Sequence, residues 1–339
     1  MIIPVPVVER ELISRIRRFA GEPRTSGGVR KASSIVAGIG DDCAVLRVPP
    51  GHEALITTDF SLEGVHFRRE WHSPQFIGHR CLTRGLSDIA AMGGEPIAAF
   101  LSLAVPARTP QKWVDGFFEG LLELAREFDV PLAGGDTTQS PDRILADIVV
   151  LGSVPKGEAI LRSRARPGDR LYATGALGGA AAETDFLYSR ASHARGKARS
   201  MKQTEALAPQ PRLPIGRILR EHKIATAMID ISDGLSTDLS HICQESGVGA
   251  EVWEQAIPRA KFRGHDVDLR FALHGGDAYE LLFTANKQTR VPASIDGVPL
   301  TEIGEVTRTK KMVIIDSAQV KHVLRPLGWE HFRQRPSSK

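Results

Sequence analysis

The sequence predicts a mixed α/β fold, α/β (α+β), in two domains. Short apolar or alternating runs at residues 97–105 and 144–152 have the length and composition of strands. Between them, apolar residues recur at helical spacing, so strands and helices are mixed along the chain. At 339 residues, the chain is also too long for one ordinary hydrophobic core.

The helix between these strands has marked ends. Thr109 is expected to cap it, and Pro110 suits its first turn. Its apolar side is formed by Trp113, Phe117, Leu121, Leu124 and Phe128. Two further helices are predicted, one from Ser73-Pro74 to a stop at Gly93-Gly94 and one from Gly234 to a stop at Gly247.

A domain boundary is predicted near residues 153–168, where prolines and glycines gather between two strand-like runs. We therefore expect an N-terminal domain over residues 1–155 and a C-terminal domain over residues 156–339. Residues 187–212 are polar, basic and rich in alanine before a proline cluster. This composition predicts a helix end followed by an exposed loop.

The composition is typical of a soluble globular protein, with 42% hydrophobic and 25% charged residues and a mean hydropathy of −0.15. No apolar run approaches the roughly 20 residues of a membrane-spanning helix, and the N-terminus lacks the basic region of a signal peptide. The three cysteines lie far apart without CxxC spacing, which argues against a disulfide framework and a thiolate metal site. We expect a cytoplasmic protein without a membrane partner.

The net charge of +4 and the pI of 9.0 raise the question of a nucleic-acid partner. Basic residues gather at 190–202 and near the C-terminus, with few aromatic residues between them. A solvated surface explains this pattern better, so no nucleic-acid binding is predicted.

Aspartates recur beside small residues at five places in the chain. They are Gly40-Asp41-Asp42, Thr57-Thr58-Asp59, Ser87-Asp88, Gly134-Gly135-Asp136 and Asp230-Ile231-Ser232-Asp233-Gly234. Four lie at the end of a strand-like run, and the segment at 87–88 falls inside a predicted helix and faces out of it. A turn or a helix cap explains any one of them alone. Their recurrence favours a shared site.

Such a site requires a cation, because carboxylates about 4 Å apart repel by about 4 kcal/mol at an effective dielectric constant of about 20. Oxygen ligands without histidine or cysteine favour Mg²⁺ over Zn²⁺, and Mg²⁺ commonly bridges substrate phosphates. This chemistry points to a nucleotide. The usual nucleotide motifs are absent, since there is no GxxxxGK[ST] loop, no HRD and DFG pair, and GALGGA at 175–180 lacks GxGxxG spacing.

Eight segments in the order of the chain together resemble the thiamine-monophosphate kinase family. They are IGDDCAVL (39–46), TTDFSLEGVHF (57–67), GLSDIAAMGGEP (85–96), GGDTT (134–138), LRSRARPGD (161–169), IDISDGLSTDL (229–239), GGDAYELLFT (275–284) and GWEHF (328–332). They cover nearly the whole chain. The wider superfamily includes aminoimidazole-ribonucleotide synthetase, selenophosphate synthetase and a hydrogenase maturation factor.

The resemblance implies a two-domain, synthetase-like fold. In it, the N-terminal domain binds ATP and metal and dimerises through its strands, while the C-terminal α/β domain packs against it and completes the active site. The resemblance also implies a homodimeric, Mg²⁺-dependent kinase that transfers the γ-phosphoryl group of ATP to thiamine monophosphate, giving thiamine diphosphate and ADP.

The resemblance further implies roles for individual residues. The family's metal-binding positions are occupied by Asp41, Thr57, Thr58, Asp59, Asp88, Asp136, Asp230 and Asp233. Its ATP contacts are occupied by Gly135, Asp136, Arg162 and Ser232. Its thiamine monophosphate contacts are occupied by His66, Asp277 and Trp329.

The chemistry of three side chains fits these roles, although each has a simpler explanation. Arg162 can bind phosphate with two hydrogen bonds, or be a surface arginine. Trp329 can stack on a flat heteroaromatic ring, or anchor the C-terminus in the core. His66 can bond a phosphate or hydroxymethyl oxygen, or simply stabilise its loop. No residue stands out as a covalent nucleophile or general base. None is needed, because a phosphate oxygen of the substrate can itself attack the γ-phosphorus.

Two alternatives stay open, namely another ATP-dependent enzyme of the superfamily and a non-catalytic nucleotide-binding homologue. GVRKASS lacks the reactive cysteine or selenocysteine of selenophosphate synthetase, and the chain ends in RPSSK rather than in the maturation factor's cysteine. The family's GGEDYEL is GGDAYEL here, and a histidine usual before the PxPR segment is replaced near Ala208-Pro209. Since every aspartate at the metal-binding positions is present, the active kinase is favoured.

Overall fold

The structure is a computed structural model that describes residues 15, 16, 18, 34–39, 43–193 and 208–332. The chain divides into two compact units. Unit 1 comprises Met1–Ile89, Gly94–Ala159 and Ala194–Leu213, and unit 2 comprises Ala90–Gly93, Ile160–His193 and Pro214–Lys339. The domain boundary between residues 155 and 156 stays a prediction.

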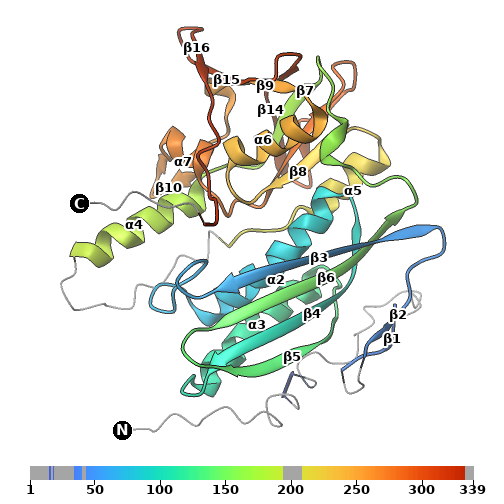
Figure 1. Cartoon of the computed structure of the whole chain (residues 1–339), viewed down its shortest axis with the longest axis vertical. Helices are drawn as coiled ribbons and strands as arrows, with labels where there is room; N and C mark the ends of the chain where they lie inside the picture. The colour runs from blue at the N-terminus through green and yellow to red at the C-terminus, as the bar shows by residue number, and fades with distance from the viewer. Residues whose placement is uncertain (1–14, 17, 19–33, 40–42, 194–207, 333–339) are drawn as a thin grey trace. The chain divides into compact units, whose positions relative to one another are not determined.

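Unit 1 is built on a four-stranded sheet with the order β3-β6-β4-β5 (Figure 1). Its strands are β3 (His52–Leu62), β4 (Glu95–Pro106), β5 (Leu132–Ser140) and β6 (Leu145–Pro155). Strand β5 runs parallel to β4, and the other two pairs are antiparallel. A separate antiparallel pair is formed by β1 (Ile35–Ala37) and β2 (Val45–Leu46).

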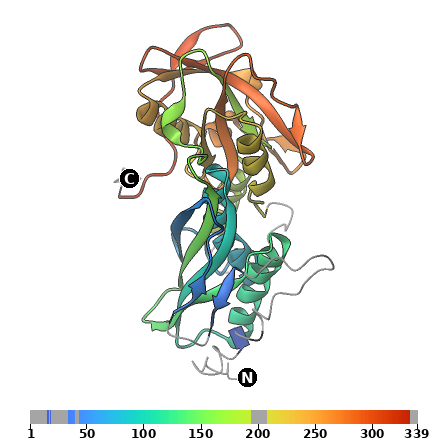
Figure 2. The ribbon, with the colours of Figure 1, turned by 90° about the vertical axis from the view of Figure 1, so that its right-hand side faces the viewer.

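Helices α2 (Pro74–Ala91) and α3 (Gln111–Glu127) cover one face of this sheet (Figures 1 and 2). They approach each other closely, because a Cβ atom at Gly78 or Gly120 would lie 1.9 Å from a main-chain oxygen of the other helix. A Cβ at Gly85 would lie 2.5 Å from the side chain of Val150 in β6. Glycine is therefore required at these helical positions, despite its poor helix propensity.

The strands alternate between the helix-covered face and the opposite, outer face. In β6, Ile148 and Val150 face the helices and are 0% exposed. In β3, Ile56 and Phe60 lie on the outer face and are 72% and 56% exposed. This period of two places every second residue of a strand on the same face.

Unit 2 is built on an eight-stranded sheet with the order β16-β15-β9-β14-β7-β12-β8, in which β13 also pairs with β14. The strands are β7 (Arg170–Thr174), β8 (Ala227–Ile231), β9 (Gly249–Trp253), β12 (Glu280–Ala285), β13 (Ser294–Ile295), β14 (Val298–Thr307), β15 (Met312–Ile315) and β16 (Lys321–Val323). Among these pairs, only β9 with β15 is parallel.

The helices of unit 2 are α4 (Gly179–His193), α5 (Leu213–Glu221), α6 (Leu235–Ser246) and α7 (Leu269–His274). Short 3₁₀ turns lie at η1 (Arg162–Arg164) and η3 (Glu254–Ala256), and a small hairpin is formed by β10 (Lys261–Phe262) and β11 (His265–Asp266). Helix α6 packs against β8, β9 and β12. The core between them includes Ile229, Leu239, Val252 and Leu282.

The predicted strands are found as β4 and β6, and the predicted helices as α2, α3 and α6. The prediction for Thr109 is wrong, since Pro110 is the N-cap of α3 and no side chain caps the helix. The main-chain N–H of Thr109 bonds to the oxygen of Pro106 at 2.9 Å, so Thr109 belongs to the preceding turn.

The predicted exposed loop before α5 is only partly described, because residues 194–207 lie outside the described residues. Its described end, at residues 208–212, is half-buried or buried, so the prediction of exposure is wrong there. The main-chain oxygen of Pro209 accepts a hydrogen bond from Thr83 Oγ1 at 3.3 Å and lies 2.9 Å from Nε2 of His79, which attaches the segment to α2. In the described part of the chain, no helix is both long and apolar enough to cross a membrane.

Candidate functional site

The first group of candidate residues lies where α2 faces β3. The hydroxyl of Thr57 donates a hydrogen bond to a carboxylate oxygen of Asp88, so Asp88 points out of its helix toward the sheet. Asp59 lies two residues after Thr57 and therefore on the same face of β3. All three residues are half-buried. Unit 1 thus brings two carboxylates and a hydroxyl to the helix-covered side of one strand.

The sheet register separates Asp136 from this group. Asp59 pairs with Ile148, Ile148 with Leu101, and Leu101 with Gly135, so three strand spacings lie between Asp59 and β5. At about 4.8 Å per spacing, this distance is about 14 Å. Asp136 is one residue further along β5 and lies on the outer face. In one copy of this sheet, Asp59 and Asp136 therefore cannot hold the same ion.

Two of the aspartate segments that were expected at the ends of strands lie inside strands instead. Residues 57–59 lie inside β3, and residues 134–136 lie inside β5. Gly135 has a φ of 146°, and a Cβ atom there would lie 1.9 Å from the main-chain oxygen of Leu101. The glycine therefore permits a close backbone approach in the sheet rather than a turn.

Thr58 belongs to the outer face, together with an aspartate that the sequence reasoning missed. Its hydroxyl donates to Oδ1 of Asp147 at 2.7 Å. The register aligns Asp147 with Ser102 and Ser102 with Asp136, so these side chains share the outer face. A signal was available, because Asp147 is the one charged residue in the run ILADIVVLG.

His66 lies in the turn that follows β3. Its Nδ1 accepts a hydrogen bond from the main-chain N–H of Leu62 at 3.0 Å. In the neutral ring the proton is therefore on Nε2, which can donate to an oxygen atom of a ligand.

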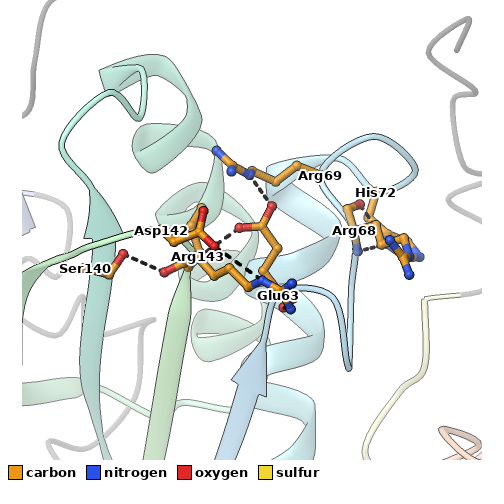
Figure 3. A network of polar contacts seen from close by, with 8 residues as sticks. Glu63, Arg68, Arg69, His72, Ser140, Asp142 and Arg143 are labelled. Atoms are coloured by element: carbon orange, nitrogen blue, oxygen red, sulfur yellow. Dashed lines mark hydrogen bonds and ion pairs between the residues drawn. The ribbon is translucent and has the colours of Figure 1, made fainter. Parts of the chain in front are cut away.

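A network around Glu63 fixes this turn (Figure 3). Glu63 forms an ion pair with Arg69, with Nε and Oε1 2.5 Å apart, and its Oε2 accepts from the main-chain N–H of Ile144 at 3.0 Å. Arg143 lies over the turn, with Nη1 3.5 Å from the main-chain oxygen of Glu63. Ser140 donates to the main-chain oxygen of Arg143 at 2.6 Å. These contacts join the turn to the connection between β5 and β6.

The acidic turn of unit 2, residues 230–234, begins with the last two residues of strand β8 and ends at the N-cap of α6. Asp230 lies inside the strand, paired with Leu281 of β12, and is 3% exposed, whereas Ser232 and Asp233, beyond the strand, are half-buried. Asp238, in the first turn of α6, was not predicted as a site residue. Its Oδ2 accepts the main-chain N–H groups of Asp233 at 3.1 Å and of Gly234 at 3.0 Å. The Asp238 side chain therefore fixes the acidic turn.

The acidic turn concentrates negative charge. Burial, followed by the charges of Asp230 and Asp233, raises the pKa of Asp238 to about 8, although its two N–H partners lower it. Possible ligand atoms of Asp233, Asp238 and His241 lie within 4.8 Å of one another. His241 adds a nitrogen donor to a set that we expected to contain oxygen only. Since the helical spacing of Asp238 and His241 is three residues, their shared face was readable in the sequence.

The segment that carries Asp277 is bonded to this turn. The main-chain N–H of Asp277 donates to the oxygen of Ser232 at 2.8 Å, and that of Tyr279 donates to the oxygen of Ile231 at 2.9 Å. Asp277 and Tyr279 have φ angles of 62° and 52°. The hydroxyl of Tyr279 donates to Oδ1 of Asp277 at 2.8 Å.

Trp329 reaches the same turn from the C-terminal part of unit 2. Its main-chain N–H donates to the oxygen of Asp233 at 2.9 Å, and that of Gly328 donates to Thr237 Oγ1 at 3.1 Å. The Trp329 side chain is half-buried rather than in the core, and its Nε1 lies 3.3 Å from Nε2 of His331. The interpretation of Trp329 as a core anchor is therefore wrong.

Arg162 is exposed at the start of η1. The hydroxyl of Ser246 donates to its main-chain oxygen at 2.7 Å and accepts from the N–H of Ala165 at 3.1 Å, which fixes η1 to the end of α6. Within the described residues, the Arg162 guanidinium has no hydrogen bond or ion pair, so it is available for an anion.

The structure thus sorts the predicted residues into groups. Unit 1 brings together Thr57, Asp59 and Asp88 on one face of β3, while Thr58, Gly135 and Asp136 lie elsewhere in the sheet and His66 lies in the adjoining turn. Unit 2 brings together Asp230, Ser232, Asp233, Asp277 and Trp329, with Arg162 on η1. Asp41 lies outside the described residues.

Known proteins resemble the chain in both halves. The model of the AIR synthase related protein N-terminal domain matches residues 40–154, and that of the C-terminal domain matches residues 166–317. The thiamine-monophosphate kinase of Bacillus subtilis (strain 168) is 34% identical over 313 residues, which are 89% of this chain and 95% of the relative.

Two solved structures extend the comparison. The thiamine-monophosphate kinase from Stenotrophomonas maltophilia K279a has a TM-score of 0.74 and 32% identity, covering 91% of this chain and 97% of that one. AaThiL complexed with AMPPCP and TMP has a TM-score of 0.71 and 27% identity, covering 84% and 89%. These likenesses confirm the predicted two-domain, synthetase-like α/β fold. With such relatives along most of its length, this chain belongs to the thiamine-monophosphate kinase family.

Proposed function

We propose that this protein is a Mg²⁺-dependent kinase that transfers the γ-phosphoryl group of ATP to thiamine monophosphate. The observation that carries the proposal is the acidic turn at 230–234, whose main-chain oxygens bond to the segments of both Asp277 and Trp329. Candidate metal ligands and candidate thiamine contacts therefore belong to one small region of unit 2. The relative AaThiL, described with AMPPCP and TMP, supports the same pair of ligands.

The donor chemistry fits Mg²⁺. Burial, and then the charges of Asp230 and Asp233, raise the pKa of Asp238 to about 8, and a cation would relieve the repulsion among these carboxylates. Asp230 and Asp233 in unit 2, and Thr57, Asp59 and Asp88 in unit 1, are the proposed holders. When bound, Mg²⁺ would neutralise charge on the phosphate oxygens of ATP.

The phosphates of ATP would be held by main-chain and arginine donors. Arg162 presents an exposed guanidinium on a turn that Ser246 fixes, which suits a bidentate phosphate contact. Gly135 and Ser232 are the other proposed ATP contacts, and Asp136, whose carboxylate has no proton to donate, would contact ATP through a metal ion. The small side chain of Ser232 permits close approach of a phosphate to the backbone, whereas the space beside Gly135 is filled by the main chain of Leu101.

Thiamine monophosphate would be oriented by three side chains. The half-buried indole of Trp329 has a face on which a flat heteroaromatic ring can stack. The Asp277 carboxylate can accept a hydrogen bond from an amino group, and Nε2 of His66 can donate one to an oxygen atom.

No covalent intermediate is required for this reaction. A phosphate oxygen of thiamine monophosphate attacks the γ-phosphorus, the bond from the γ-phosphorus to the bridging oxygen breaks, and ADP leaves. The protein contributes alignment and charge neutralisation. The aspartates accordingly act as metal holders rather than as general bases.

The finer features of the proposal are a homodimer and a cytoplasmic location. The exposed apolar side chains of Ile56 and Phe60 on the outer face of the unit 1 sheet support a dimer formed through these strands. The described cysteines Cys43, Cys81 and Cys243 are free thiols, which suits a reducing compartment.

The direct test incubates the purified protein with Mg²⁺, ATP and thiamine monophosphate and separates the products by chromatography. Thiamine diphosphate and ADP should form in equal amounts. Asp230→Asn should abolish the product, whereas Asp142→Asn, which changes an 86% exposed carboxylate outside the acidic segments, should not. ADP without thiamine diphosphate would show ATP hydrolysis instead, and binding of ATP without turnover would favour the non-catalytic homologue.

A further inference from the structure

Tyr279 joins the core of unit 2 to a proposed substrate contact. The residue is 1% exposed, so its ring lies inside the unit. Its hydroxyl donates to Oδ1 of Asp277 at 2.8 Å, and its main-chain N–H donates to the oxygen of Ile231 at 2.9 Å. One residue therefore contacts both the carboxylate of Asp277 and the backbone of the acidic turn.

The backbone of Tyr279 is unusual for an aromatic residue. Its φ of 52° lies in the left-handed region, which disfavours side chains with a bulky Cβ substituent. Asp277, two residues earlier, has a φ of 62°, which a short polar side chain tolerates better. Such conformations persist where surrounding contacts enforce them, and here a buried ring and two main-chain hydrogen bonds do so.

The hydroxyl adds a contact that burial of the ring does not require. A phenylalanine at this position would fill the same apolar space, but it would leave Oδ1 of Asp277 without the phenolic donor. An aspartate side chain has two torsion angles, so one strong hydrogen bond to a fixed donor largely sets its carboxylate plane. The donor is fixed, because the ring that carries it is buried.

We propose that Tyr279 is a positioning residue that orients the Asp277 carboxylate for recognition of the thiamine part of the substrate. This inference rests on the proposed function. Tyr279 would act through Asp277 and would not touch the reacting atoms. Its loss should therefore weaken the selection of thiamine monophosphate more than the use of ATP.

The test compares Tyr279→Phe with Tyr172→Phe in steady-state kinetics and thermal unfolding. Tyr172 is a matched control, because its hydroxyl also donates to a carboxylate, Oε2 of Glu302, at 2.9 Å. Tyr172 lies in strand β7 and does not contact Asp277 through this hydrogen bond. Tyr279→Phe should raise KM for thiamine monophosphate by about tenfold, the effect of losing one hydrogen bond to a charged group. KM for ATP should stay within about twofold of wild type, as should both constants in Tyr172→Phe.

A double-mutant cycle separates positioning from a general structural role. In the Asp277→Ala background, Tyr279→Phe should cause no further rise in KM for thiamine monophosphate, because its effect passes through the missing carboxylate. Additive effects, or an equal rise in both KM values with a lowered Tm, would overturn the inference, as would an unchanged KM in Tyr279→Phe. If the wild-type protein makes no thiamine diphosphate, the proposed function fails instead.

Discussion

At the scale of single residues, buried polar side chains fix the turns that carry the candidate site. Asp238 accepts hydrogen bonds from two main-chain N–H groups of the acidic turn. Ser236 is 0% exposed, and its hydroxyl oxygen lies 2.8 Å from Nδ1 of His274. Ser236 also accepts from the N–H of Leu327 at 3.3 Å. A few side chains of α6 therefore position backbone segments that are far apart in the sequence.

His274 should make stability depend on pH. Burial lowers its pKa below the ordinary value of 6.5. Because the folded state then binds a proton less readily than the unfolded chain, this contribution to stability is present above pH 6.5 and is lost as pH falls below it. His274→Gln should flatten this loss. Urea unfolding at pH 7.5 and at pH 5.5, on both proteins, measures the difference, and an equal loss in both would contradict the assignment.

The Asp277 side chain should affect KM for thiamine monophosphate and not KM for ATP. It is shorter by one methylene than the glutamate usual in the family motif, so a water molecule can bridge its contact with thiamine at little cost. Asp277→Ala should raise KM for thiamine monophosphate, with KM for ATP nearly unchanged, and Asp277→Glu should be tolerated. An equal rise in both KM values would contradict the assignment of Asp277 to thiamine.

At the scale of secondary structure elements, the contact between α2 and α3 depends on glycine. A Cβ atom at Gly78 would lie 1.9 Å from the main-chain oxygen of Phe117, and neither backbone can move without disturbing the sheet beneath. The helices therefore pack backbone against backbone. This packing also places Asp88 of α2 beside Thr57 of β3.

Gly78→Ala should consequently destabilise unit 1. Alanine in an unobstructed helix would stabilise the protein by about 1 kcal/mol, so the sign of the effect is diagnostic. We expect a loss of about 2 kcal/mol or more from the steric clash. Urea unfolding monitored by circular dichroism measures it, and Gly38→Ala, whose Cβ would have no neighbour closer than 3.4 Å, is the control. A gain in stability would show that the helices separate freely.

The sequence predicted these elements better than it predicted the site. Helices α2, α3 and α6 were recognisable, because apolar spacing, proline and glycine are local signals. The bond between Thr58 and Asp147 joins residues 89 positions apart, and no spacing rule detects it. The sequence also placed residues 57–59 at the end of a strand, whereas they lie inside β3, where alternation puts Thr58 and Asp59 on opposite faces.

At the scale of the whole molecule, ligand binding should be visible as stability. The acidic groups repel when no cation is present, so Mg²⁺ with ATP should raise Tm clearly. At a ligand concentration 100 times Kd, the free energy of unfolding should increase by about 2.7 kcal/mol. Asp59→Asn and Asp136→Asn should each abolish turnover and leave the fold intact. Since these residues lie about 14 Å apart across the sheet, each should lower the Tm rise separately. Full activity in excess EDTA would contradict the metal proposal.

The last prediction concerns association of the chain with a second copy. Ile56 and Phe60 lie on the outer face of β3 and are 72% and 56% exposed, on a sheet whose opposite face is covered by helices. Single exposed apolar residues are common, but two on one strand face suit burial in an interface. Light scattering should therefore give twice the chain mass of 36.9 kDa at micromolar concentration.

Ile56→Lys should shift the mass toward one chain, because a buried lysine charge without a partner is costly. Val323→Lys is the matched control, since Val323 is 69% exposed on β16 of unit 2 and should leave the dimer unchanged. A wild-type protein of 36.9 kDa would refute the dimer, and a dimer that survives Ile56→Lys but not Val323→Lys would move the interface to unit 2.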